Sequence, residues 1–108
     1  MRYPIISMRE LDCWISCKRP MELIDLRAPG AYEYCHLTGA VNIPFEELED
    51  MIEEGRLCEF QKGVPLVLYC QRGSQSLLAC NHLSLLGLPV ISVAGGMAAY
   101  RGSWLEWG

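Results

Sequence analysis

The stretch VPLVLYCQRGSQSLLACNHLSLLGLP, residues 64–89, carries the clearest fold signal in the chain. Its first six residues are almost all apolar, which is typical of a parallel strand buried on both faces of a sheet. A polar segment, residues 70–75, follows directly. Apolar residues then recur at helical spacing until Gly87 and Pro89 end the pattern; these residues are Ala79, Leu83 and Leu86. The stretch therefore predicts a buried strand, a loop and a helix.

Short apolar runs alternate with helical patterns on both sides of this stretch. The expected strands cover residues 4–6, 22–27, 40–43, 64–69 and 90–93, and the expected helices cover 8–16, 29–34, 45–54, 74–86 and Met97 onward. At the start of the first helix, Ser7 and Glu10 have the spacing of a capping box. This alternation predicts an α/β fold, a mostly parallel sheet of about five strands with helices on both faces.

Composition limits the classes of protein to which the chain can belong. A length of 108 residues, 51% of them hydrophobic, predicts a single domain, 1–108, with one well-filled core. The net charge is −4 and no Lys/Arg cluster occurs, which argues against nucleic-acid and membrane partners. No apolar run approaches the ~20 residues of a membrane-spanning helix, and no secretory signal pattern is seen. We therefore expect a cytoplasmic protein whose six cysteines are thiols.

Cys70 is the candidate nucleophile. It follows the most buried strand and precedes a helix, and ligands of open α/β sheets bind beyond the carboxyl ends of the strands. The start of a helix offers unpaired N–H groups and a partial positive charge, which stabilise a thiolate or a bound oxyanion. A cysteine at a strand end can also be a small core residue, but the polar loop after it favours a reactive thiol. The candidate substrate-binding residues are Gln71, Arg72, Gly73, Ser74, Gln75 and Ser76.

The chain resembles the single-domain rhodaneses, a family of sulfurtransferases. The resemblance rests on LIDLR (23–27), YEYCHLTGAVNIP (32–44), VLYCQRGSQS (67–76), GLPV (87–90) and GGM (95–97), and covers nearly the whole chain. It implies a rhodanese-like fold without a metal or organic cofactor. It also implies that Cys70 takes a sulfur atom from thiosulfate or a polysulfide, becomes a persulfide, and passes the sulfur to a thiol, cyanide or protein acceptor. Arg72 would attract an anionic donor, and Gln75 and Ser76 would hydrogen-bond the sulfur or the donor.

Three other functions stay open. A related phosphatase would need an arginine six residues after Cys70 to clamp phosphate, and Ser76 stands there. Rhodanese-like domains also serve as docking or regulatory modules. A redox sensor or persulfide carrier would need a resolving cysteine, for which Cys35 and Cys58 are candidates. Many loops of the family carry arginine where Gln75 stands, so this loop has one positive charge fewer with which to bind thiosulfate.

The remaining polar residues are expected to have structural roles. We interpret His36 as a hydrogen-bonded imidazole and expect Arg27 to pair with Glu33. The spacing of Cys13 and Cys17 is not the C-x2-C of a zinc site, so no metal site is predicted. Cys80, within the helix after the loop, is expected to be a packing residue. The Gly95–Gly96 pair is either a plain turn or a close approach of the backbone to the site.

Overall fold

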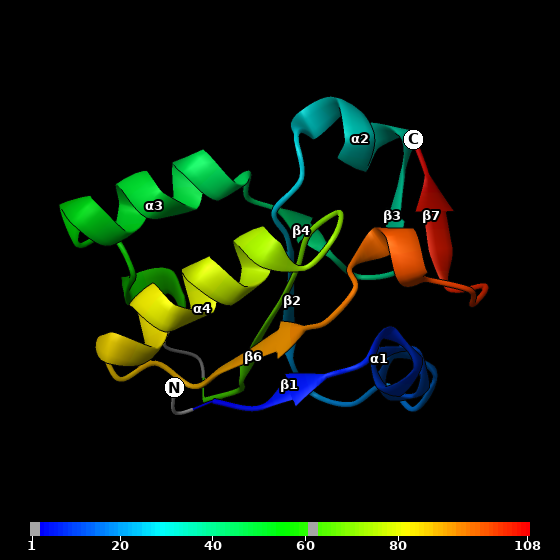
Figure 1. Ribbon diagram of the computed structural model, residues 1–108, viewed down its shortest axis with the longest axis horizontal. Coiled ribbons are helices and arrows are strands. Elements are labelled where there is room, and N and C mark those ends of the chain that lie inside the picture. The colour runs from blue at the N-terminus through cyan, green and yellow to red at the C-terminus, as the bar shows by residue number, and fades with distance from the viewer. Residues whose placement is uncertain (1–2, 61–62) are drawn as a thin grey trace.

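The computed structural model describes residues 3–60 and 63–108 and contains the expected parallel sheet (Figure 1). Its five strands lie in the order β1-β6-β5-β2-β4, and every neighbouring pair is parallel. The strands are β1 (Ile5–Ile6), β2 (Glu22–Asp25), β4 (Val41–Asn42), β5 (Leu66–Tyr69) and β6 (Val90–Val93). The apolar run that stands out in the sequence is thus the central strand β5, which is buried along its whole length.

Four helices follow the predicted boundaries closely. They are α1 (Met8–Ser16), α2 (Pro29–Tyr34), α3 (Phe45–Glu54) and α4 (Ser74–Leu85). At the start of α1, the Ser7 hydroxyl accepts from the Glu10 N–H while the Glu10 carboxylate accepts from the Ser7 N–H, so the capping box is confirmed. Proline at the first position of α2 and Gly55 at the end of α3 mark the other predicted helix ends.

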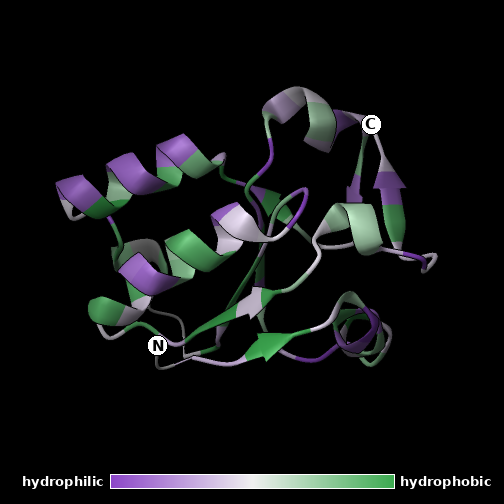
Figure 2. Ribbon diagram, viewed as in Figure 1, coloured by the Kyte–Doolittle hydropathy of each residue, from purple (hydrophilic) through white to green (hydrophobic). Residues whose placement is uncertain are grey.

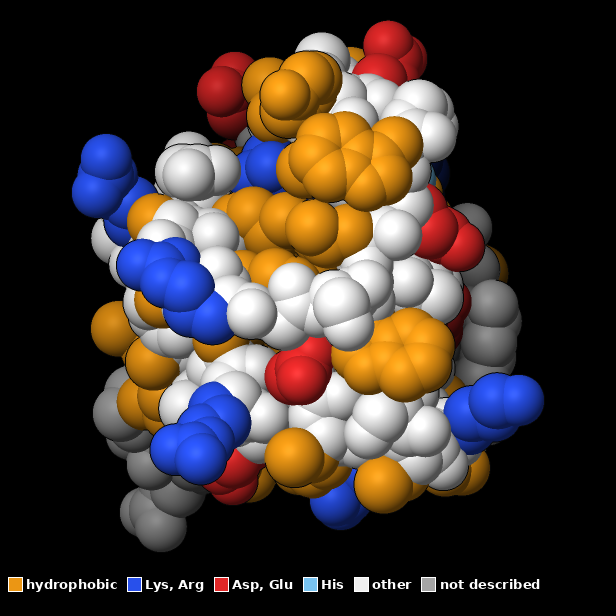
Figure 3. All heavy atoms as spheres, turned by 90° about the vertical axis from the view of Figure 1, so that its right-hand side faces the viewer, with side chains coloured by type: hydrophobic (Ala, Val, Ile, Leu, Met, Phe, Trp, Pro, Cys, Tyr) orange, Lys and Arg blue, Asp and Glu red, His pale blue; other side chains and the backbone are white. Residues whose placement is uncertain are grey.

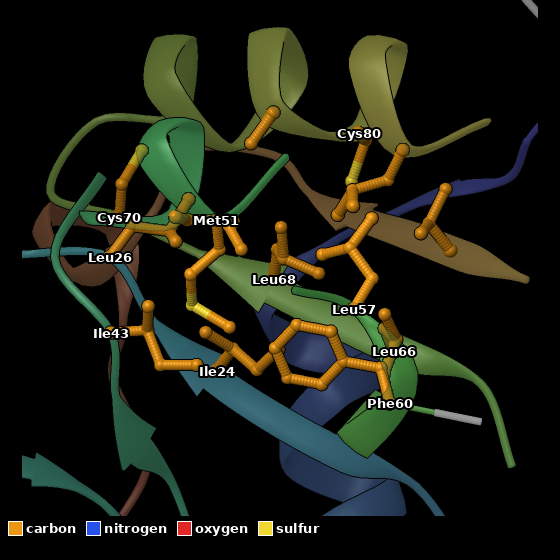
Figure 4. Close-up of a cluster of buried hydrophobic side chains, with 14 residues drawn as sticks. Ile24, Leu26, Ile43, Met51, Leu57, Phe60, Leu66, Leu68, Cys70 and Cys80 are labelled. Atoms are coloured by element: carbon orange, nitrogen blue, oxygen red, sulfur yellow. The ribbon is translucent and has the colours of Figure 1, made fainter. Parts of the chain in front are cut away.

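Alternation along the strands divides the core between the two faces of the sheet. Leu66 and Leu68 of β5 pack with α3 and α4, in the cluster drawn in Figure 4. Val67 and Tyr69, the intervening residues, pack with α1 on the opposite face. The prediction of helices on both faces is therefore confirmed.

The prediction of a helix from Met97 onward is wrong. Met97–Ala99 form only a 3₁₀ turn, and the chain then forms a further strand, β7 (Leu105–Trp107). This strand pairs antiparallel with β3 (Cys35–Leu37), which the sequence pattern did not predict either. The Tyr100 hydroxyl redirects the chain, because it donates to the Asp12 carboxylate at 2.6 Å and accepts from the Trp104 N–H at 2.8 Å. The other 3₁₀ turn, Cys58–Phe60, lies after α3 and was also not predicted.

The helices differ in how they meet solvent (Figure 2). Only Leu48 and Met51 of α3 are buried, and its other face carries acidic residues such as Glu46 and Glu47. On the side of the molecule that carries α2 and the β3–β7 pair, hydrophobic side chains reach the surface (Figure 3). Tyr34 and Trp107 are exposed and are in edge-to-face contact with each other. Within the described residues, no helix combines the length and the apolarity needed to cross a bilayer.

A buried ion pair fixes the carboxyl end of β2. The Arg27 guanidinium donates to both oxygens of Asp25, with the shortest contact at 2.8 Å, and also to the Cys35 carbonyl. The predicted pairing of Arg27 with Glu33 is wrong: Glu33 is exposed, while Asp25 is fully buried next to Arg27 on the same side of the chain. Burial opposes the charge on Arg27, but the Asp25 carboxylate more than offsets that penalty and raises its pKa.

Candidate active site

Cys70 lies directly after β5, at the edge of the core cluster beside Leu26 (Figure 4). Its side chain is only 2% exposed. The sulfur accepts two backbone hydrogen bonds, from the Gly73 N–H at 3.1 Å and from the Ser76 N–H at 3.4 Å. The predicted nucleophile is thus the convergence point of N–H groups at the start of α4, which is an arrangement that stabilises negative charge on sulfur.

The loop between Cys70 and α4 depends on Gly73. This residue precedes the helix at the N-cap position with φ of 102°, a conformation that L residues with a side chain rarely adopt. Among the described residues, no side chain caps α4. In the described part of the chain, the N–H groups of Ser74 and Gln75 also have no acceptor, as is usual for a first helical turn. The N–H groups that reach the Cys70 sulfur, those of Gly73 and Ser76, are likewise not used by hydrogen bonds within the helix.

A second loop, residues 95–98, holds the carbonyl side of the Cys70 segment. The Met97 N–H donates to the Cys70 carbonyl at 2.8 Å, and the Ala98 N–H donates to the Gln71 carbonyl at 2.9 Å. Gly96 allows this approach, because a Cβ atom there would lie 2.3 Å from the Cys70 carbonyl oxygen. Of the two interpretations of Gly95–Gly96, the close approach to the site is the one observed.

Replacing Gly96 with alanine is expected to lower both stability and activity. A side chain at its φ of 60° and ψ of −163° costs about 1–3 kcal/mol in free energy of unfolding, and the clash with the Cys70 carbonyl displaces the loop. Gly87→Ala is the matched control, since Gly87 has φ of 83° but no atom within 4 Å of an added Cβ. Urea unfolding and the rate of sulfur loading on Cys70 measure the two effects. Equal loading rates in the two variants would show that the close approach is unimportant for the site.

Five of the predicted site residues line one open cavity of about 300 Å³. They are Cys70, Gln71, Arg72, Ser74 and Gln75. The side chain of Ser76 lies elsewhere: it is fully buried, and its hydroxyl contacts the Gly73 carbonyl at 3.1 Å and the Ser92 hydroxyl at 3.2 Å. Ser76 reaches the sulfur through its backbone N–H. The contribution of Ser92 to this arrangement had no signal in the sequence beyond its place in a strand.

The other cysteines are free thiols outside this cavity. Cys80 is buried in α4, and burial raises its pKa to about 12, so it stays protonated at neutral pH and serves packing as predicted. Cys35 is half-buried on β3, and Cys58 is exposed in the 3₁₀ turn after α3. Neither of the two candidate resolving cysteines lines the cavity at Cys70.

His36 is a structural residue, as predicted. It is buried in β3, stacks on Tyr32 with ring centroids 3.7 Å apart, and bonds through Nδ1 to the Tyr32 carbonyl at 2.9 Å. Its Nε2 contacts Glu106 at 3.1 Å. Among residues 3–60 and 63–108, no three His, Cys, Asp or Glu side chains are grouped in a way that could hold a metal ion.

The family profile described as the rhodanese-like domain matches residues 7–103, including the Cys70 loop and the 95–98 loop. The chain belongs to the rhodanese-like domain family. Its fold is similar to that of a rhodanese-like domain protein from Staphylococcus aureus, with a TM-score of 0.80 and 25% identity over 97% of this chain and 98% of that one. It is also similar to a rhodanese from E. coli, determined with anions, with a TM-score of 0.64 and 30% identity over 82% of this chain and all of that one.

Among curated proteins, this rhodanese-like domain is similar to the adenylyltransferase and sulfurtransferase MOCS3 of Anopheles gambiae. The two are 39% identical over 85 residues, which cover 75% of this chain and 19% of the relative. The chain thus spans about a fifth of the length of the curated relatives it matches. The similarity extends to proteins named as sulfurtransferases.

Proposed function

We propose that the protein is a sulfurtransferase in which Cys70 carries the transferred sulfur as a persulfide. The observation that carries this proposal is the position of the Cys70 sulfur, 3.1 Å from the Gly73 N–H and 3.4 Å from the Ser76 N–H, at the wall of an open cavity. Backbone N–H donors directed at the sulfur stabilise the negative charge that a nucleophilic thiolate or a persulfide carries. The sulfurtransferase relatives support the same assignment.

The reaction divides into two displacements. In the first, the Cys70 thiolate attacks the outer sulfur of thiosulfate or of a polysulfide. A bond forms between Sγ and that sulfur, and the donor's own S–S bond breaks, with its electron pair leaving on sulfite or on the shortened polysulfide. In the second, the thiolate of an acceptor, or cyanide, attacks the outer sulfur of the persulfide. The Sγ–S bond breaks and the electron pair returns to the Cys70 thiolate.

The loop residues have distinct proposed roles in these steps. The unused N–H groups of Ser74 and Gln75 are available to the outer sulfur or to donor oxygens. Gln71, Ser74 and Gln75 add polar side chains at the cavity. Arg72 places a positive side chain at the cavity and attracts an anionic donor. The acceptor is a small thiol, cyanide or a protein thiol, and this thiol chemistry suits a reducing compartment such as the cytoplasm.

Arg72→Ala is expected to raise the KM for thiosulfate by about 1.4- to fivefold with little change in kcat. The size follows from the 0.2–1 kcal/mol that exposed charge interactions contribute, since Arg72 is exposed. Arg56→Ala removes the same charge from the exposed pair with Glu54 and is not a residue of the cavity. Initial rates at fixed acceptor concentration compare the two variants. Equal KM values would mean that Arg72 does not act on the donor.

Steady-state kinetics test the proposed function. Two displacements with a covalent intermediate predict ping-pong behaviour, so double-reciprocal plots at several acceptor concentrations form parallel lines. Intersecting lines would exclude a free persulfide intermediate. Absence of any turnover with thiosulfate and polysulfide would instead support a docking module. A role as persulfide carrier predicts sulfur loading without acceptor turnover, followed by reduction through another thiol of the chain.

A further inference from the structure

A second cavity adjoins the one at Cys70. It measures about 350 Å³ and is lined by Leu26, Ala28, Pro29, Pro44, Phe45, Glu46 and Gln75. Gln75 lines both cavities, so the two are neighbours at this residue. We call the second one the side cavity. A molecule whose sulfur lies at Cys70 can therefore extend past Gln75 into the side cavity.

The walls of the side cavity are held at the carboxyl edge of the sheet. Leu26 follows β2 and is 1% exposed, and Figure 4 shows it beside Cys70 within one core cluster. Phe45 begins α3 and packs against the same cluster. Its N–H donates to the Leu26 carbonyl at 2.9 Å, which fixes the two walls relative to each other. This hydrogen bond and the packing on the core cluster place both residues within the fold.

Charge differs between the two cavities. Among the residues that the structure describes, the charged one lining the cavity at Cys70 is Arg72, and the charged one lining the side cavity is Glu46. Apolar side chains or prolines make up most of the remaining side-cavity wall. An anionic sulfur group is favoured at the first cavity. In the second, the apolar parts of the wall can contact an uncharged group, and the Glu46 carboxylate repels anions.

We propose that the preferred sulfur donors have an anionic sulfane end and an uncharged apolar body that occupies the side cavity, with Phe45 as a specificity-determining residue. This inference rests on the proposed function of Cys70. It also gives Gln75 a role: as an uncharged side chain that lines both cavities, it adds no cation that would hold a small dianion such as thiosulfate at Cys70 alone.

Two thiosulfonate anions test the proposal because they share one reacting group. Benzenethiosulfonate and methanethiosulfonate each react with the Cys70 thiolate at the outer sulfur. The Sγ–S bond forms, the donor's S–S bond breaks, and a sulfinate leaves with the electron pair. The two donors have equal charge and differ in the apolar body. Their ratio of kcat/KM, divided by the ratio of their rates with a free small thiol, isolates the contribution of the protein.

The wild-type protein is expected to prefer the benzene donor by about tenfold after this correction, since a small apolar group in a hydrophobic pocket contributes about 10- to 200-fold and the side cavity is partly open. Phe45→Ala is expected to reduce the corrected ratio to within about twofold of unity. Ile52→Ala is the matched control: Ile52 lies on the same helix and packs on the same cluster but does not line the side cavity. This variant should keep the wild-type ratio.

Ala28→Asp is a second variant, and it leaves the side chains of the hydrophobic core unchanged. Ala28 is exposed and occupies the N-cap of α2, where aspartate is favoured, so the change adds a charge to the side-cavity wall without opposing folding. It should also lower the corrected ratio. A wild-type ratio near unity, or a ratio unchanged by both Phe45→Ala and Ala28→Asp, overturns the inference and leaves the proposed function standing. If neither donor places sulfur on Cys70, the proposed function itself is wrong.

Discussion

Cys70→Ser is expected to lower sulfur-transfer turnover at least about a thousandfold while leaving the fold intact. Serine keeps an acceptor for the Gly73 and Ser76 N–H groups, so the loop and the start of α4 retain their hydrogen bonds. The hydroxyl cannot form the persulfide, because its oxygen is barely ionised at neutral pH and is a poor nucleophile toward sulfur. Initial rates with thiosulfate and cyanide measure the loss, and circular dichroism with thermal unfolding monitors the fold.

Cys13→Ser is the control for the chemical change. Cys13 is an exposed thiol on α1, so its substitution should leave turnover within about twofold of the wild-type rate because surface changes usually have small effects. Turnover above a tenth of the wild-type rate in Cys70→Ser would contradict the assignment of Cys70 as the nucleophile. Loss of turnover in Cys13→Ser as well would indicate that activity depends on a different thiol.

Asp25→Ala is expected to lower the free energy of unfolding by about 3–5 kcal/mol, the usual cost of leaving one partner of a buried ion pair uncompensated. Asp25 is fully buried, and its carboxylate accepts from the Arg27 side chain and from the Arg27 N–H at 2.8 Å. Without it, a guanidinium that is 8% exposed lacks its counter-charge. Urea unfolding followed by fluorescence of the three tryptophans gives the difference.

Glu54→Ala provides the comparison, because it removes the carboxylate of the exposed pair with Arg56, in which both side chains are more than half exposed. Its cost is expected to stay below about 1 kcal/mol. The double variant Asp25→Ala, Arg27→Met removes the uncompensated charge and should recover part of the stability lost in Asp25→Ala. A similar loss in Asp25→Ala and Glu54→Ala would show that the buried pair contributes no more than a surface contact.

Most of the helix ends could be predicted because they depend on local signals. The capping box at Ser7 and Glu10, the proline at the start of α2 and Gly55 after α3 each act within one turn of the chain. The buried strand β5 could be recognised because a short apolar run before a polar loop suits a central parallel strand. The predicted strand ends were less accurate, because hydrogen bonding to neighbouring strands, and not the local residues, decides where a strand ends.

Features that depend on distant contacts could not be predicted. Strand β7 exists through its pairing with β3, some 70 residues earlier, as in the pair of His36 with Glu106. The pairing of Arg27 with Asp25 instead of Glu33 reflects burial, which charge patterns do not reveal. A three-residue strand such as β3 carries too few residues to show a period of two.

The candidate site was predictable in its main residue and less so in its surroundings. Cys70 could be singled out because a thiol between a buried strand and a helix meets the unused N–H groups of the helix. The chain segments that support the site come from elsewhere: the 95–98 loop donates to the Cys70 and Gln71 carbonyls, and Ser92 contacts the Ser76 hydroxyl. The glycine pair at 95–96 was the one sequence feature that pointed to this contact.

The most direct test of Cys70 as the sulfur carrier is the intact mass of the protein after brief incubation with thiosulfate or polysulfide. The persulfide assignment predicts a gain of one sulfur atom that cyanide removes, and the same treatment of Cys70→Ala should give no gain. Peptide mapping should place the added sulfur on the peptide that contains Cys70. No gain with either donor, or a gain that persists in Cys70→Ala, would contradict the assignment of Cys70 as the sulfur carrier.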